Sequence, residues 1–95
     1  MISLLIFALD KENIERKRYH IGDLGDEKFL HDKLCLLHVD GENWKILYTE
    51  RGVVSRVSDH SFLYDAVKDF FVRVIGHQLQ WAYRDKWEKE TGLLF

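Results

Sequence analysis

The sequence predicts a single domain of the α+β class. Its 95 residues are 46% hydrophobic and 14% aromatic, which suits one core and is too little chain for two. Apolar residues alternate between 34 and 57, as in strands joined by short turns, and recur at helical spacing between 62 and 75. We therefore expect an N-terminal helix, an antiparallel meander of three to four strands, and C-terminal helices packed on one face of the sheet, in one domain over residues 1–95.

The first expected element is a helix over residues 2–12, ended by Asn13. Its apolar residues share one helical face: Leu4, Leu5, Ala8 and Leu9. The run from Leu4 to Leu9 also suits a buried strand, and periodicity does not separate the two readings. The segment lacks the basic start and the cleavage site of a secretory signal and is too short to span a bilayer, so we expect a buried element of a cytoplasmic protein.

Strands are expected in the middle of the chain. A short strand over residues 18–21 ends at Gly22, and residues 27–33 fit a helical turn or a strand equally well. The meander follows at 34–39, 44–50 and 53–57, with turns at Asp40-Gly41-Glu42-Asn43 and Arg51-Gly52. We expect Gly52 to supply a positive φ, and Glu50 or Arg51 either to tie this turn by charge-assisted hydrogen bonds or to touch a partner.

Two helices are expected after the meander. Ser58-Asp59-His60-Ser61 is typical of a helix start, because short polar side chains cap free backbone N–H groups. The helix over 62–75 then turns one apolar stripe towards the sheet: Leu63, Val67, Phe70, Phe71 and Val74. A further stripe predicts a helical extension over 77–95 that ends near Gly92: Leu79, Ala82, Tyr83 and Trp87. Trp81 and Trp87 lie six residues apart, so one should be more exposed, and the tail Leu93-Leu94-Phe95 must dock on this chain or another.

Charge is distributed unevenly along the chain. The net charge of −2 provides no overall attraction to nucleic acid, and we expect no direct binding to it. Residues 20–42 nevertheless carry six carboxylates against two lysines, a net −4, whereas residues 11–18 are net +2. Such an edge is commonly plain solvated surface; the alternative is a surface that attracts a basic partner. The candidate contacts are Asp23, Asp26, Glu27, Asp40, Glu42 and Trp44, the last being either a lid on the core or an interface anchor.

Catalytic and metal-binding motifs are missing from the sequence. It has no P-loop, dinucleotide-binding glycine pattern, zinc-ligand spacing or nucleophile elbow, so we expect no catalytic residue, no metal and no cofactor. The lone Cys35 lies in an apolar run and should be a packed thiol in a reducing compartment. A metal-free ribonuclease remains an alternative, in which His20, His38 and Lys45 converge across the sheet.

One segment resembles a known family. Leu36 to Gly52, above all Trp44 to Gly52, resembles the "dGkWxvyYxERG" segment of the bacterial immunity protein 59 family. Asn13 and Tyr19-His20-Ile21-Gly22 take the places of the family's asparagine break and "YxIxG" strand. Ala66 and Phe70-Phe71 match its helix, whereas Tyr64-Asp65 matches the family's acidic pair only in part. The resemblance covers residues 2–75 and leaves the extension outside.

The resemblance implies a function. Members of such a family are cytoplasmic proteins encoded beside a toxin gene of a polymorphic or contact-dependent inhibition system. They bind the cognate toxin domain, usually a nuclease, and neutralise it by occlusion without chemistry. We accordingly expect a monomer or weak homodimer with a protein partner and no membrane association. The second interpretation is a homodimeric adaptor or secretion chaperone that associates through residues 79–95.

Overall fold

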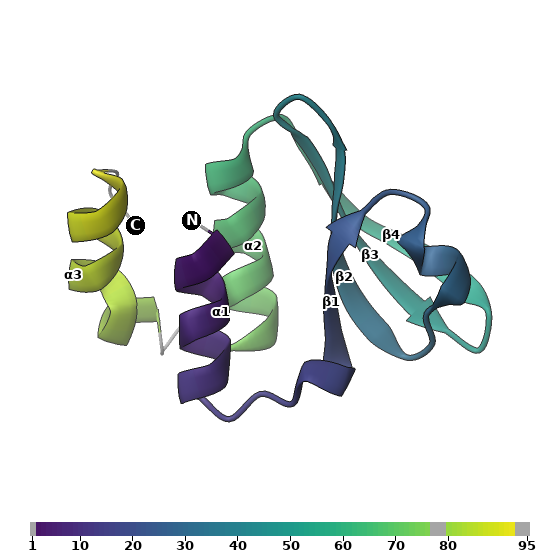
Figure 1. The fold of residues 1–95 in the computed structure, drawn as a ribbon, viewed down its shortest axis with the longest axis horizontal. Coiled ribbons are helices and arrows are strands. Elements are labelled where there is room, and N and C mark those ends of the chain that lie inside the picture. The colour runs from purple at the N-terminus through teal and green to yellow at the C-terminus, as the bar shows by residue number, and fades with distance from the viewer. Residues whose placement is uncertain (1, 77–79, 93–95) are drawn as a thin grey trace.

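The computed structural model describes residues 2–76 and 80–92 of the chain (Figure 1). The predicted α+β class and the order of its elements are confirmed. The helices are α1 (Ile2–Lys11), α2 (Leu63–Val74) and α3 (Gln80–Thr91), with short 3₁₀ turns η1 (Arg16–Arg18) and η2 (Asp26–Phe29). The strands are β1 (Tyr19–Asp23), β2 (Lys33–Asp40), β3 (Asn43–Glu50) and β4 (Val53–His60).

The four strands form one sheet in the order β1-β2-β3-β4. The predicted meander is confirmed, because β2, β3 and β4 pair antiparallel. The first strand differs from the expected antiparallel arrangement: β1 runs parallel to β2, with Tyr19 opposite Leu34 and Asp23 opposite His38. A parallel pair needs a connection that crosses over, and residues 24–32 provide it. This crossover settles the ambiguous segment at 27–33 as the end of η2, a short link and the start of β2.

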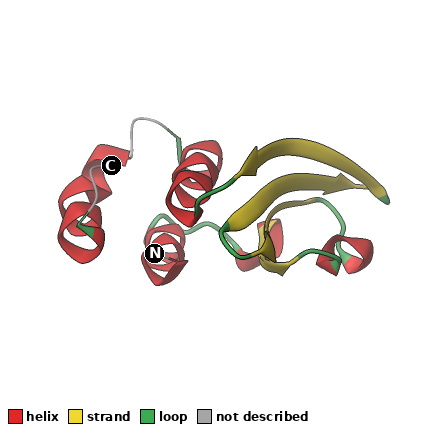
Figure 2. Cartoon of the chain, turned by 90° about the horizontal axis from the view of Figure 1, so that it is seen from above, coloured by secondary structure: helices red, strands yellow, loops and turns green. Residues whose placement is uncertain are grey.

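The core lies between one face of the sheet and the pair α1 and α2 (Figure 2). The predicted stripe of α1 is buried throughout, which excludes the strand reading of this segment. From α2, Val67, Phe70 and Phe71 are at most 1% exposed, and they face Leu36 and Ile46 of the sheet. Burial of each such side chain stabilises the fold by about 1.5–3 kcal/mol relative to exposure.

The third helix forms an outer layer on the same side of the sheet, beyond α1 and α2 (Figures 1 and 2). Tyr83 meets Phe71 edge-on at 5.6 Å between ring centroids, and Trp87 lies 5.8 Å from Tyr64. Both α3 aromatics are buried within their own chain. Trp87 is therefore not free to form the dimer surface of an adaptor. The side chains of Trp81 and Ala82, together with Leu79 and the tail 93–95, lie outside the described residues.

Local backbone geometry explains two boundaries. Arg51 and Gly52 have φ of +49° and +81°, the pair of left-handed residues that a type I′ hairpin turn requires. The predicted positive φ of Gly52 is confirmed, but the expected tie is not found among the described residues for either Glu50 or Arg51. The predicted helix start at 58–61 is also wrong. Strand β4 continues to His60, because Ser58 and His60 direct their side chains to Asp69 of α2, and Phe62 precedes the helix without a side-chain cap.

The second face of the sheet carries a smaller apolar cluster. Cys35, Leu37 and Leu47 are buried there, and Leu30 from the crossover packs against them. The prediction of a packed thiol is confirmed, since Cys35 is fully buried. Burial, with a smaller contribution from Glu27, raises the pKa of this thiol to about 11.

Candidate functional site

Three candidate carboxylates meet at one end of the sheet, which we call the acidic end: Asp23, Asp40 and Glu42. Asp40 closes β2 and Glu42 lies in the turn to β3, at the top of Figure 1. Asp23 joins them because β1 runs parallel to β2, so that the carboxyl ends of the two strands lie at the same edge. An antiparallel β1 would have carried Asp23 to the opposite end.

The acidic end is exposed and its charge is only partly compensated. The side chain of Asp23 is 82% exposed, and Asp40 and Glu42 are exposed as well. Among the described residues, no lysine or arginine lies within ion-pair distance of these three carboxylates. Asp40 accepts a 2.6 Å hydrogen bond from the Asn43 amide, which stiffens the turn and leaves its charge intact. The end therefore presents a negative field to an approaching molecule.

Asp26 serves the fold more than the surface. Its Oδ2 accepts a 3.0 Å hydrogen bond from the backbone N–H of Asp23 and a 2.8 Å hydrogen bond from Nε2 of His20. The bond from His20, followed by that from Asp23, holds the pKa of this carboxyl below its usual range. Asp26 therefore fixes the backbone that carries Asp23, and its own oxygen is already engaged.

Gly22 makes room for this brace. A Cβ on Gly22 would lie 2.5 Å from His20 Nε2 and closer still to Asp26 Oδ2, so only glycine fits beneath the pair. The sequence analysis assigned Gly22 to the end of a strand. The close approach shows that it is instead needed for the side chains that cross it.

Glu27 has a similarly local role. Its Oε2 accepts a 2.7 Å hydrogen bond from the backbone N–H of Gly25, which has a φ of +108° at the start of η2. The carboxylate thus holds the tight turn that begins the crossover. Of the six predicted contacts, Asp26 and Glu27 position this crossover, and the acidic end supplies the exposed charges.

Trp44 packs as a half-buried lid beside the acidic end. It lies opposite His38 in the β2–β3 register, with 4.8 Å between ring centroids. His38 Nε2 donates a 2.8 Å hydrogen bond to the Gly41 carbonyl, so the imidazole also holds the turn. A hollow of about 250 Å³ next to this pair is lined by Trp44 and by polar residues such as Asn43 and Ser61. Trp44 is therefore both part of the core edge and part of an accessible wall.

Two exposed apolar residues near these carboxylates were missed by the sequence analysis. Phe29 ends η2 with 83% of its surface exposed, and Leu24 follows Asp23 with 47% exposed. A phenylalanine inside the polar stretch 26–28 was the available signal. It stayed unread because the segment 27–33 fitted two secondary structures. An exposed aromatic ring beside charged groups is the usual composition of an interface anchor.

Other predicted residues lie away from the acidic end. Asp32 belongs to the acidic segment of the sequence, but it precedes β2 and lies at the opposite end of the sheet. Glu50, Arg51 and Gly52 form the β3–β4 turn, also at that opposite end. The motif that carries the family resemblance is therefore separated from most of the predicted contacts.

The histidines do not converge as the ribonuclease alternative requires. His20 is opposite Cys35, on the second face, whereas His38 is opposite Trp44, on the helix face. Lys45 is opposite Leu37 and so shares the face of His20. The two imidazoles that would act as acid and base therefore lie on different faces of the sheet.

Ser58, His60 and Asp69 form a compact cluster with the residue types of a nucleophilic triad. Asp69 Oδ2 accepts from both Ser58 Oγ and His60 Nε2, each at 2.7 Å, and Ser58 Oγ lies 3.2 Å from the same nitrogen. A triad needs the serine and the carboxylate on different imidazole nitrogens. Because both meet at Nε2 here, the cluster is a structural link between β4 and α2.

Metal and membrane sites were sought over the same range. Within residues 2–76 and 80–92, no group of three or more histidine, cysteine or carboxylate side chains could hold a metal ion. None of the helices as described is long and apolar enough to cross a bilayer. Comparison with protein-family models, with curated proteins and with solved structures found no match to this chain.

Proposed function

We propose that this protein is an immunity protein, which binds and neutralises a cognate bacterial toxin domain by occluding it. The toxin class that fits best is a nuclease effector of a polymorphic or contact-dependent inhibition system. The observation that carries the proposal is the acidic end, where Asp23, Asp40 and Glu42 remain exposed without a basic partner in the described chain. The resemblance of Trp44 to Gly52 to an immunity-protein segment supports it from the sequence.

Nucleases bind polyanions through basic surfaces, and a basic surface is what the acidic end complements. Carboxylates at the rim speed association and reject partners of like charge, but contribute modestly to final affinity. The affinity must come from desolvated contacts, and Phe29 is the best placed anchor because 83% of its surface is available to a partner pocket. Occlusion of the toxin requires no reacting group on this chain.

The test uses the toxin domain encoded immediately upstream of this gene. Co-expression of this chain should restore growth, and calorimetry should give a saturable complex. The variant D40K/E42K should bind at least tenfold more weakly, because two attractive contacts become repulsive. Its thermal stability should not fall, since both residues are exposed.

The matched control is E50K/D85K, which changes the net charge equally at exposed residues away from the acidic end. It should bind as the unaltered chain does. Equal affinity of D40K/E42K and the unaltered chain would reject this surface, and failure of the chain to protect cells from the neighbouring domain would reject the function.

A further inference from the structure

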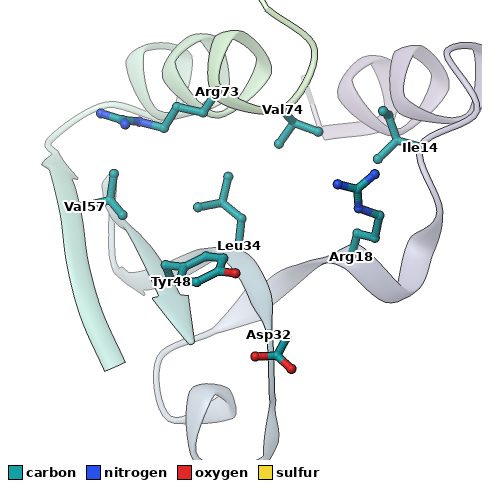
Figure 3. A pocket seen from close by; sticks show the side chains of 8 residues that line it. All are labelled: Ile14, Arg18, Asp32, Leu34, Tyr48, Val57, Arg73 and Val74. Atoms are coloured by element: carbon teal, nitrogen blue, oxygen red, sulfur yellow. The ribbon is translucent and has the colours of Figure 1, made fainter. Parts of the chain in front are cut away.

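A hollow of about 610 Å³ opens between the helix layer and the sheet, at the end opposite the acidic end (Figure 3). Its floor consists of Leu34, Tyr48 and Val57 on three adjacent strands, and Val74 of α2 and Ile14 close it from the helix side. Pockets for small molecules span about 300–1,000 Å³ and combine apolar walls with a few polar groups. The hollow has both the size and the composition of such a pocket.

The hollow exists because the sheet extends further than the helices that cover it. Helix α2 ends at Val74, whereas β3 and β4 continue to the turn at 51–52. Tyr48 lies on the helix face of β3 but is 38% exposed. A register shift opposite Ile46 and Leu47 adds one residue to β4, and Val57 at that point turns towards the core. An apolar floor is thus left without a covering helix.

One guanidinium points into this apolar space. Arg18, at the end of η1, extends between Ile14 and Val74 in Figure 3, and the Tyr48 hydroxyl lies on the edge of its ring nearer to Arg18. Among the described residues no side chain pairs with Arg18. Arg73, on the far margin, already donates from Nε to Asp69 Oδ1 at 2.7 Å. The free cation of the hollow is therefore the one that reaches over its floor.

We propose that this hollow binds a small amphipathic monoanion: an aromatic or aliphatic carboxylate whose head pairs with the Arg18 guanidinium and the Tyr48 hydroxyl. The apolar body of the ligand lies against Leu34, Val57 and Val74. A guanidinium binds a carboxylate through two parallel hydrogen bonds, which fixes the head while the floor accepts the body.

Charge at the margin favours a monoanion over a polyanion. Asp32 lies at the lower edge of the hollow and repels a second negative group. A nucleic acid strand or a phosphorylated ligand would bring several charges to a site with one free cation. The proposal is independent of toxin binding, because the hollow and the acidic end lie at opposite ends of the sheet.

The test is a titration of the full chain with phenylbutyrate, followed by amide-resolved NMR, with phenylbutyramide as the uncharged control. We expect saturable shifts around Leu34, Tyr48 and Val74 with a dissociation constant in the millimolar range or below. R18Q should weaken binding about tenfold, because a charge-assisted contact is lost. Y48F should weaken it about threefold, since a single neutral hydrogen bond is removed.

R16Q is the matched control: Arg16 lies in the same η1 turn but is paired with Asp10 at 3.0 Å, and this variant should bind normally. Each variant is first compared with the unaltered chain by its NMR spectrum and melting temperature. Equal binding of the amide, unchanged affinity in R18Q, or no saturable shift in the millimolar range would overturn the proposal. R18Q should keep its affinity for the toxin domain, so failure here and failure of the immunity function are separable.

Discussion

His60 at the end of β4 donates a hydrogen bond of 2.7 Å to Asp69 in the middle of α2. The same carboxylate accepts from Ser58 Oγ at 2.7 Å and, through its other oxygen, from Arg73 Nε at 2.7 Å. Three donors thus converge on one partly buried group. The edge strand β4, which has a neighbour on one side only, is attached to the helix layer by this carboxylate.

Replacing Asp69 with asparagine should destabilise the fold by about 1–3 kcal/mol, measured by urea unfolding at pH 7. Burial alone would raise the pKa of Asp69, but hydrogen bonds from Ser58 and His60 and the charge of Arg73 outweigh it and lower the pKa. The ionised carboxylate therefore stabilises the fold above about pH 4, the ordinary range of the group, and this contribution disappears as the pH falls through the lowered value. The stability curves of D69N and the unaltered chain should converge in acid. D65N, at an exposed position of the same helix, is the control; parallel curves for D69N at all pH values would contradict the assignment.

Gly22→Ala should destabilise the fold by about 1–3 kcal/mol, because the new methyl group displaces the His20–Asp26 pair. The measurement is urea unfolding of G22A, H20A and the double variant. Removing the imidazole frees the space, so the alanine should cost less in the H20A background. Additive losses would mean that the methyl group is accommodated without moving the pair.

Trp87→Ala should destabilise the fold by about 3–5 kcal/mol, since the indole is fully buried against α2. K89A, at an exposed position of the same helix, should change stability little. Light scattering should give a monomer mass for the unaltered chain. A tight dimer that W87A dissociates, with no loss of monomer stability, would contradict the packing of α3 within one chain and favour the adaptor interpretation.

Cys35 should resist thiol reagents in the folded protein. Its pKa of about 11 leaves little thiolate at pH 8, and the side chain is fully buried. The rate of reaction with a disulfide reagent should rise steeply with urea, in step with unfolding. Rapid reaction without denaturant would show that the second face opens far more readily than its packing indicates.

The sequence was informative wherever one periodicity dominated. The stripe of Val67, Phe70 and Phe71 predicted α2 and its buried face, and alternation around Ile46 predicted the meander. These patterns report burial on one side of an element, which is the strongest physical constraint on a short chain. The direction of β1 was out of reach, because five residues of strand carry no information on whether the chain then turns back or crosses over.

The candidate site was predictable as a composition and not as a geometry. The acidic segment predicted charge, yet only the parallel pairing brings Asp23 to Asp40 and sends Asp32 to the other end. The exposure of Phe29 depends on η2, whose short 3₁₀ turn has no periodic signal. Ser58 and His60 were read as cap residues because local sequence favours that role, whereas their contact with Asp69 is tertiary.

The Tyr83 hydroxyl donates to Glu12 across 71 positions of the chain, at 2.5 Å, and this bond joins α3 to the segment just after α1. During synthesis the sheet and the acidic end can be complete while residues 83–87 are still within the ribosome. The outer layer is then added to a domain that already carries its recognition surface. A nascent chain of this protein would thus be competent to meet its partner before its own last helix has docked.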